Sequence, residues 1–138
     1  MSDETSKELR TNITGAGKLE LSIVSVPMPQ PKDGEVLIRV EATPINPSDL
    51  GLLLGPADVS TMTITGSGDD AVVSMDIPDA MMPAMAARVD QPLPAGNEGA
   101  GVVIAAGAGA EDMVGKTIGV AGGAMYSQYR CVPAASCL

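Results

Sequence analysis

The segment Leu93–Ile104 (LPAGNEGAGVVI) has the most informative pattern in the sequence. Pro94 and Gly96 interrupt regular structure and lead into the polar pair Asn97-Glu98. A Gly-Ala-Gly triplet and a run of branched apolar residues follow, and such a run is typical of a buried strand. The order predicts a turn that delivers two hydrogen-bonding side chains to the edge of a strand, beside small residues that let another backbone or a ligand come close. The pattern suits a binding site, and it also suits an ordinary loop end.

The composition predicts one folded domain with an acidic surface. A chain of 138 residues with 45% apolar residues is long enough to bury its own core. Phe and Trp are absent, so the core must consist of Val, Ile, Leu, Ala and Met. The 8 basic and 17 acidic residues give a net charge of −9. This charge argues against nucleic acid and against an anionic membrane surface as partners, because both require a basic face.

The cysteines and the chain start indicate the compartment. Cys131 and Cys137 could form a disulfide only if the end of a strand folded back, and two free thiols in a reducing cytoplasm are the preferred interpretation. The segment Met1–Arg10 is polar and of mixed charge, unlike a signal peptide. No apolar run approaches the roughly 18 residues of a transmembrane helix. We therefore expect a cytoplasmic protein.

Short strands are expected to dominate the fold. The polar segment Met1–Asn12 is predicted to be a frayed start. Leu19–Ile23 alternates as a half-buried strand does, and Glu35–Ala42 is the clearest strand of the chain. Seven or so short strands with Gly/Pro turns predict a mainly β fold, a partly closed β-barrel with one or two short helices. The remaining strands are expected at Val102–Ala106, at Lys116–Ala121 and at Met125–Val132, where Tyr126 and Tyr129 are predicted to pack.

One short helix is predicted after the strand Glu35–Ala42. Asn46 can be its N-cap and Pro47 suits its first position. Four leucines follow, and Gly55-Pro56 ends the helix. Asp49 falls in the first turn, where the helix dipole favours an acid. Asn46 could cap this helix, meet a ligand directly, or do both.

Residues 57–93 are predicted to contain a β-hairpin. Thr61–Thr65 alternates, Gly66–Asp70 reads as a five-residue loop, and Ala71–Ile77 can pair back. Met81–Arg88 could then form one or two helical turns, limited by Pro83. Ordinary packing is the preferred role for the methionines of this stretch, over lining a plastic pocket. They are Met62, Met75, Met81, Met82 and Met85.

Three motifs resemble a known superfamily. GNEGAGVV (96–103) resembles the GHEGAGVV segment of medium-chain dehydrogenases/reductases, and ATPINPSDL (42–50) is similar to the INPSD segment of zinc-independent quinone and enoyl-thioester reductases. Residues 114–119 and 122–129 are similar to the GD-V and G-YAEY segments of the same superfamily. The matches follow the superfamily's order. They imply that residues 1–138 form a GroES-like, N-terminal, substrate-side domain, in which 58–93 is an insertion near the mouth of the site.

Several parts of the superfamily pattern are absent. Zinc-dependent members hold zinc with a Cys and a His at the positions of Asn46 and Asn97, and the chain has no His. Because amides are poor zinc ligands, no zinc or other metal is expected. No G-x-G-x-x-G motif with a Rossmann context is present, so the resemblance implies a fragment whose nucleotide-binding domain follows it in a longer protein. Enoyl-thioester reductases have a QGxY tyrosine where this chain has Leu54–Ala57, which argues against that particular activity.

The resemblance implies a zinc-independent oxidoreductase. It would transfer hydride from NADP or NAD to a small-molecule quinone, enone or other activated C=C or C=O substrate, with Asn46 and Asn97 as catalytic hydrogen-bonding groups. Tyr126 or Tyr129 could also serve as an acid, although packing in the strand is the preferred role for both. The isolated chain is expected to be inactive and to bind no nucleotide tightly, and a homo-oligomer is compatible with the sequence. The alternative is a stand-alone GroES-like barrel used for protein interaction or assembly. The expected substrate- or cofactor-binding residues are Ile45, Asp49, Glu98 and Tyr126.

Overall fold

The computed structural model describes residues 4–138, which form two compact units. The first unit contains the chain up to Glu8, together with Ser25–Ile45 and Gly96–Leu138. The second unit contains Leu9–Val24 and Asn46–Ala95. The chain therefore passes between the units several times, and strands β1 (Thr5–Ile13) and β2 (Lys18–Pro27) contribute residues to both.

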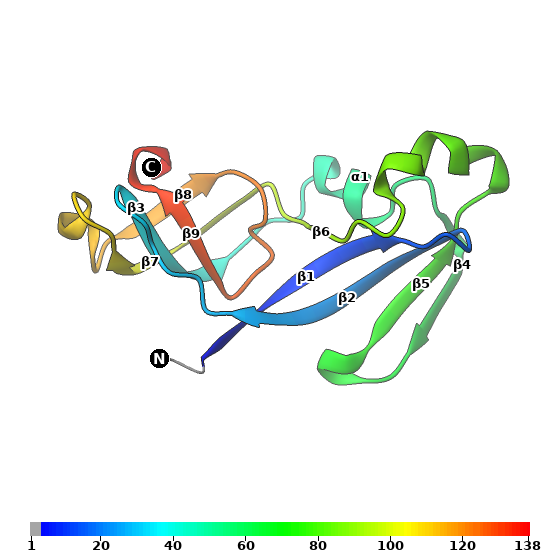
Figure 1. The fold of residues 1–138 in the computed structure, drawn as a ribbon, viewed down its shortest axis with the longest axis horizontal. Coiled ribbons are helices and arrows are strands. Elements are labelled where there is room, and N and C mark those ends of the chain that lie inside the picture. Colours follow the sequence, from blue (N-terminus) through cyan, green and yellow to red (C-terminus); the bar gives the residue numbers. More distant parts are fainter. Residues whose placement is uncertain (1–3) are drawn as a thin grey trace. The chain divides into compact units, whose positions relative to one another are not determined.

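The first unit contains an antiparallel four-stranded sheet in the order β8-β7-β3-β9 (Figure 1). Its main core residues are buried branched side chains with Met125, as the lack of Phe and Trp required. The bounds are β3 (Glu35–Ala42), β7 (Glu98–Ala106), β8 (Thr117–Ala121) and β9 (Tyr129–Pro133), with 3₁₀ helices at η4 (Glu111–Met113) and η5 (Ala134–Ser136). The core residues are Val36, Ile38, Val103, Ala110, Ile118, Val120, Met125 and Val132.

The second unit contains a five-stranded sheet in the order β4-β5-β2-β1-β6. Ile13, Leu19, Met75 and Ile77 form its core. Neither sheet order closes on itself, and the predicted mainly β class is confirmed. The remaining bounds are β4 (Asp58–Thr65), β5 (Val72–Asp76), β6 (Leu93–Pro94), the α-helical turn α1 (Leu50–Leu53) and the 3₁₀ helices η1 (Pro47–Asp49), η2 (Gly68–Asp70) and η3 (Asp79–Arg88).

Several local predictions are confirmed. Strand β3 has the predicted bounds, and β4 and β5 form the predicted antiparallel hairpin, with Ile64 opposite Val73. The methionine prediction holds in part, because Met75 is fully buried whereas Met62 is exposed. The segment predicted to form one or two helical turns before Val89 is the 3₁₀ helix η3, which contains Pro83.

The predicted frayed start is wrong from Thr5 onward, and residues 4–138 contain nine strands rather than seven or so. Strand β1 pairs with β6, which places Thr11 opposite Leu93. The strand was hidden in the sequence because polar Ser6 and Thr11 occupy buried positions, which removes the apolar alternation. The Thr11 hydroxyl accepts a hydrogen bond from the Arg88 guanidinium at 3.4 Å. Residues 1–3 of the predicted start lie outside the described residues.

Several strand boundaries also differ from the predictions, among them the end of β2, which runs to Pro27 rather than Ile23, and the start of β4, which lies at Asp58 rather than Thr61. Strand β7 begins at Glu98 rather than at Val102, and β9 begins at Tyr129 rather than at Met125. Tyr126 therefore lies in a loop and not in a strand. The loop turns because Ala124 adopts a left-handed conformation with φ of 65°, and its carbonyl accepts a hydrogen bond from the Ser127 hydroxyl at 3.0 Å.

Ala124→Gly is expected to stabilise the chain by about 0.5–1 kcal/mol. A left-handed backbone costs a residue with a Cβ about 1–2 kcal/mol, and glycine's greater freedom in the unfolded chain cancels only part of this gain. The midpoint of urea denaturation should rise without a change of slope. A fall in the midpoint would mean that the alanine methyl group contributes more packing energy than the backbone strain removes.

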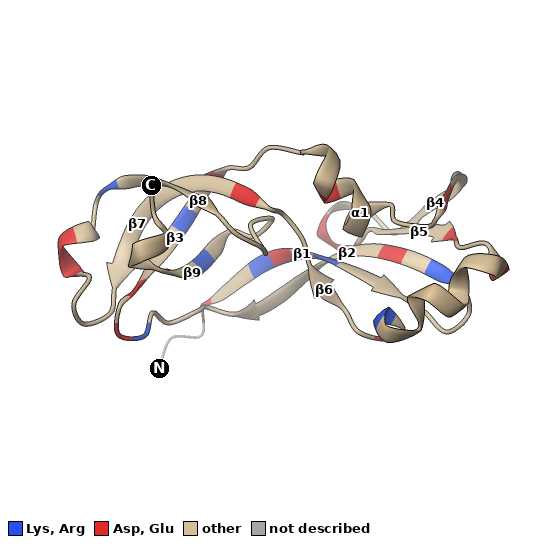
Figure 2. Ribbon diagram, turned by 90° about the horizontal axis from the view of Figure 1, so that it is seen from above, with Lys and Arg blue, Asp and Glu red and all other residues tan. Residues whose placement is uncertain are grey.

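Charges of both signs occur in the two units, with acidic residues more frequent and the Lys and Arg residues scattered among them (Figure 2). Among the helices in the described part of the chain, none is both long and apolar enough to span a membrane.

Candidate functional site

The glycines of GNEGAG allow close packing of the protein's own backbone. Gly96 has φ of 103°, and a Cβ there would lie 2.6 Å from the Tyr126 backbone nitrogen. A Cβ at Gly99 would lie 2.8 Å from Cγ2 of Thr43, and one at Gly101 would lie 2.2 Å from the Arg39 carbonyl oxygen. These distances are below contact distance, so each position accepts only glycine without a shift of its neighbours. The small residues expected beside the polar pair thus serve the contacts of β7 with β3 and with loop 122–128.

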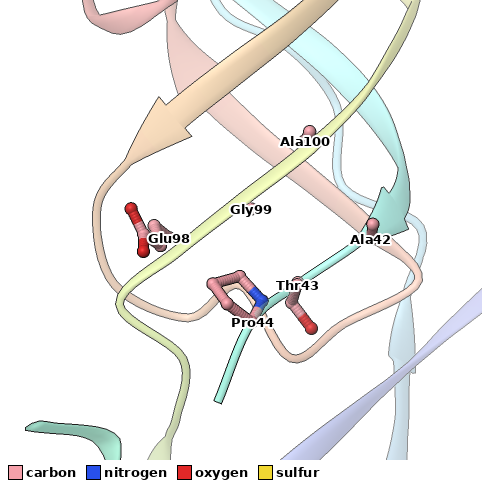
Figure 3. A pocket seen from close by; sticks show the side chains of 6 residues that line it. All are labelled: Ala42, Thr43, Pro44, Glu98, Gly99 and Ala100. Carbon is pink, nitrogen blue, oxygen red and sulfur yellow. The ribbon is translucent and has the colours of Figure 1, made fainter. Parts of the chain in front are cut away.

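A pocket of about 480 Å³ lies where β3 ends and β7 begins. Ala42 pairs with Ala100 across the two strands, and the chain after Ala42 runs past Gly99. Figure 3 shows the Glu98 side chain projecting from β7, while Thr43 and the Pro44 ring project from the segment after β3. The wall is mostly small and apolar, with one carboxylate and one hydroxyl as its polar side chains. Its six lining residues are Ala42, Thr43, Pro44, Glu98, Gly99 and Ala100.

Four of the predicted site residues belong to the first unit. Tyr126 donates its hydroxyl hydrogen to the Pro44 carbonyl oxygen at 2.9 Å, and Pro44 lines the pocket. Ile45 follows Pro44 and is 73% exposed, unusual for so large an apolar side chain. Asn97 is exposed, and its backbone carbonyl accepts a hydrogen bond from the Gly122 N–H at 2.8 Å. The structure thus brings the Pro44–Ile45 segment and Tyr126 together, and it places Glu98 in the same pocket wall as Pro44.

Asn46 and Asp49 belong to the second unit, where they begin the predicted helix. Asn46 occupies the N-cap position, and Pro47 is the first residue of η1. The Asp49 carboxylate, only 2% exposed, accepts a hydrogen bond from the Asn46 backbone N–H at 2.8 Å. The capping role predicted for Asn46 is confirmed, and Asp49 uses its carboxylate within the same cap. A direct role of either side chain toward a ligand stays a prediction.

Of the six lining residues only Glu98 was a predicted site residue, and the other five were not predicted: Ala42, Thr43, Pro44, Gly99 and Ala100. Both strands were predicted, and an antiparallel pairing of β3 with β7 would have indicated these residues. Antiparallel strands place the end of one beside the start of the other. The register was not available from the sequence. It shifts between Val40 and Ala42, which sets how closely Thr43 approaches Gly99.

The two cysteines are free thiols, as predicted. Burial raises the pKa of the Cys131 thiol above its usual value, the neighbouring Glu35 carboxylate raises it further, and Arg130 partly opposes this. Burial also raises the pKa of Cys137. Among residues 4–138, no three His, Cys, Asp or Glu side chains are grouped so that they could hold a metal ion.

Both thiols are expected to alkylate more slowly than an unhindered cysteine near neutral pH. Thiolate is the reactive form, and a raised pKa leaves a smaller thiolate fraction at each pH below it. The rate of iodoacetamide labelling, followed by peptide mass spectrometry from pH 7 to 10, should have its midpoint above the value of about 8.5 for a free cysteine. A midpoint at or below that of a short unstructured cysteine peptide would contradict the burial of these thiols.

The mainly β fold, with a pocket between the motif segments 42–50 and 96–103, is consistent with the expected GroES-like class of domain. Residues 32–138 match the alcohol dehydrogenase GroES-like domain. The match covers more than half of the chain, so the chain belongs to this family, and its resemblance to the medium-chain dehydrogenase/reductase superfamily is confirmed.

Solved structures and one curated relative agree with this assignment. A mycobacterial quinone oxidoreductase aligns with a TM-score of 0.55 and 21% identity over 96% of this chain and 32% of its own. A crotonyl-CoA carboxylase/reductase in complex with NADP aligns with a TM-score of 0.58 and 15% identity over 99% of this chain and 37% of its own. At these identities the likeness establishes the fold alone. The chain spans about a third of the length of either structure.

A zinc-type alcohol dehydrogenase-like protein of Schizosaccharomyces pombe is 62% identical over 34 residues, which are 25% of this chain and 10% of that protein. The strong local identity supports the family assignment, whereas its short extent leaves the activity of the whole protein to be proposed.

Proposed function

We propose that this chain is the substrate-side domain of an NAD(P)H-dependent oxidoreductase that acts on quinones, enones or other activated C=C or C=O groups. The observation that supports the proposal is the pocket between β3 and β7, which is built from the two motif segments most similar to the reductases. Such reductases use the nicotinamide as hydride donor, and the protein supplies binding and orientation.

The chemistry of the pocket wall supports a neutral, flat ligand group. Its small side chains at Ala42, Gly99 and Ala100 leave room against the Pro44 ring, and its volume is within the usual range for small-molecule sites. The six lining residues include no Lys or Arg, and Glu98 contributes a carboxylate. A nicotinamide or substrate ring fits these residues, whereas the phosphates of a dinucleotide do not.

In the proposed reaction this chain's residues orient the reacting carbonyl. The Asn97 amide, beside Glu98 at the start of β7, would donate a hydrogen bond to the carbonyl oxygen of the substrate or to the nicotinamide amide. Ile45 would offer apolar contact next to the Pro44 wall. We also propose that zinc has no part, because amide side chains at Asn46 and Asn97 are poor substitutes for thiolate and imidazole ligands.

The test is an assay of the natural gene product that contains this chain. Oxidation of NADPH and NADH is followed at the nicotinamide absorbance with a simple quinone and with an enone, before and after treatment with a zinc chelator. We expect acceptor-dependent oxidation that the chelator leaves unchanged, and no oxidation by residues 1–138 alone. A gene product that consumes neither nucleotide with either acceptor would refute the proposal.

A further inference from the structure

We infer that Tyr126 is a positioning residue, which fixes the Pro44–Ile45 segment against the start of β7 and so sets the shape of the pocket. Its hydroxyl is directed at the protein backbone, which distinguishes this role from that of a proton donor. An effect of Tyr126 on catalysis rests on the proposed function, whereas its fixing of the Pro44–Ile45 segment does not.

Tyr126 contacts the Pro44 backbone directly. The Tyr126 hydroxyl donates its hydrogen to the Pro44 carbonyl oxygen at 2.9 Å. Pro44 lines the pocket and directly precedes Ile45, the exposed apolar residue of the predicted site. Because the hydroxyl hydrogen is engaged with a backbone carbonyl, proton donation to a substrate would break this bond.

The loop that carries Tyr126 also contacts the residues that lead into β7. The Met125 N–H donates to the Gly96 carbonyl at 3.2 Å, and the Gly122 N–H donates to the Asn97 carbonyl at 2.8 Å. The Tyr126 ring is so near Gly96 that a Cβ there would lie 2.8 Å from its Cδ1 atom. One loop therefore bonds to Pro44 of the pocket wall and to the two residues that directly precede Glu98 in the other wall segment.

Loop 122–128 is itself held in place by other parts of the first unit. Met125 is fully buried in the core of the first unit. The Gly123 carbonyl accepts a hydrogen bond from Nε of Arg130 at 3.2 Å, and the Ala124 carbonyl accepts one from the Ser127 hydroxyl at 3.0 Å. The left-handed backbone at Ala124 persists because these contacts determine its conformation. A loop held from several sides can act as a fixed point for the Pro44 carbonyl.

Tyr126→Phe in the 138-residue chain tests the structural content. The matched control is Tyr129→Phe, which removes the other tyrosine hydroxyl from strand β9 of the same sheet. Amide hydrogen exchange is measured by NMR for Asn46, whose hydrogen-bonded N–H directly follows the Pro44–Ile45 segment, and for Gly122 and Met125 of the loop. Val36 and Ile38 serve as core references. We expect exchange at Asn46, Gly122 and Met125 to accelerate by about tenfold in Tyr126→Phe, with the core references and the control unchanged. Unchanged exchange there, or equal acceleration in both variants, would overturn the inference.

The same variants in the full gene product separate positioning from proton donation. A positioning role predicts that Tyr126→Phe raises KM by about tenfold, lowers kcat less, and leaves the pH profile of kcat unchanged. A fall in kcat of about 100-fold with loss of one limb of the pH profile would instead make Tyr126 the acid and overturn the inference. If the wild-type gene product lacks reductase activity, the proposed function fails, and the exchange experiment alone decides on the positioning role.

Discussion

Gly101→Ala is expected to destabilise the chain by about 3 kcal/mol or more, the largest effect on stability that we predict. The new Cβ would lie 2.2 Å from the Arg39 carbonyl oxygen and 2.9 Å from its carbonyl carbon. These atoms belong to the backbone of β3, which pairs with β7 on one side and with β9 on the other. The clash therefore cannot be relieved by a rotamer change and must separate strands at the centre of the sheet.

Urea denaturation of the variant and the wild-type chain measures this effect. The matched control is Gly119→Ala on the neighbouring strand β8, where a Cβ would meet nothing within 4 Å and where φ is not positive. The control is expected to change stability by less than about 1 kcal/mol, with a small gain favoured because alanine has less freedom in the unfolded chain. Similar losses in both variants would show that the close approach of β7 to β3 is not what requires glycine at 101.

Asn97→Ala is expected to lower kcat of the full gene product by about 100-fold, the largest effect on activity. A hydrogen-bond donor aimed at the oxygen on which charge develops commonly contributes this much. Asn97 is exposed, and alanine keeps the backbone carbonyl that accepts the bond from Gly122, so the thermal midpoint shows directly whether folding is affected.

Steady-state kinetics with the better acceptor, together with the thermal midpoint of each protein, separate the two effects. Thr117→Ala is the control, since this residue is exposed on the edge strand β8 and lies outside the pocket. We expect its kcat to equal that of the wild type. A wild-type rate in Asn97→Ala would remove Asn97 from the catalytic site, even if the protein proves to be a reductase.

The parts of the fold that follow from local pattern were predictable. Strand β3 has Val36, Ile38 and Val40 at alternate positions between a glycine turn and a proline. The cap at Asn46 has its side-chain signals within four residues. Strand β1 was not predictable, because its buried positions at Ser6 and Thr11 are polar and their burial depends on distant strands.

The candidate site was predictable in its segments but not in its contacts. The motif glycines were recognised as sites of close approach, yet the sequence could not distinguish a ligand from the backbone of β3. The hydrogen bond from Tyr126 to Pro44 joins residues 82 positions apart, so no local sequence pattern predicts it. Tyr126 was expected in a strand, and its loop depends on the left-handed backbone of Ala124, a residue that seldom adopts it.

The most direct test of the proposed function is to follow the hydride itself. The full gene product is incubated with an enone and with NADPH deuterated at the transferable position of nicotinamide C4, and the reduced product is examined by mass spectrometry. The proposal predicts one deuterium bound to carbon in the product, transferred without exchange with water. It lies on the β-carbon if the C=C group is reduced and on the carbonyl carbon if the C=O group is reduced. A reduced product without deuterium, or no reduced product with any acceptor tested, would contradict it.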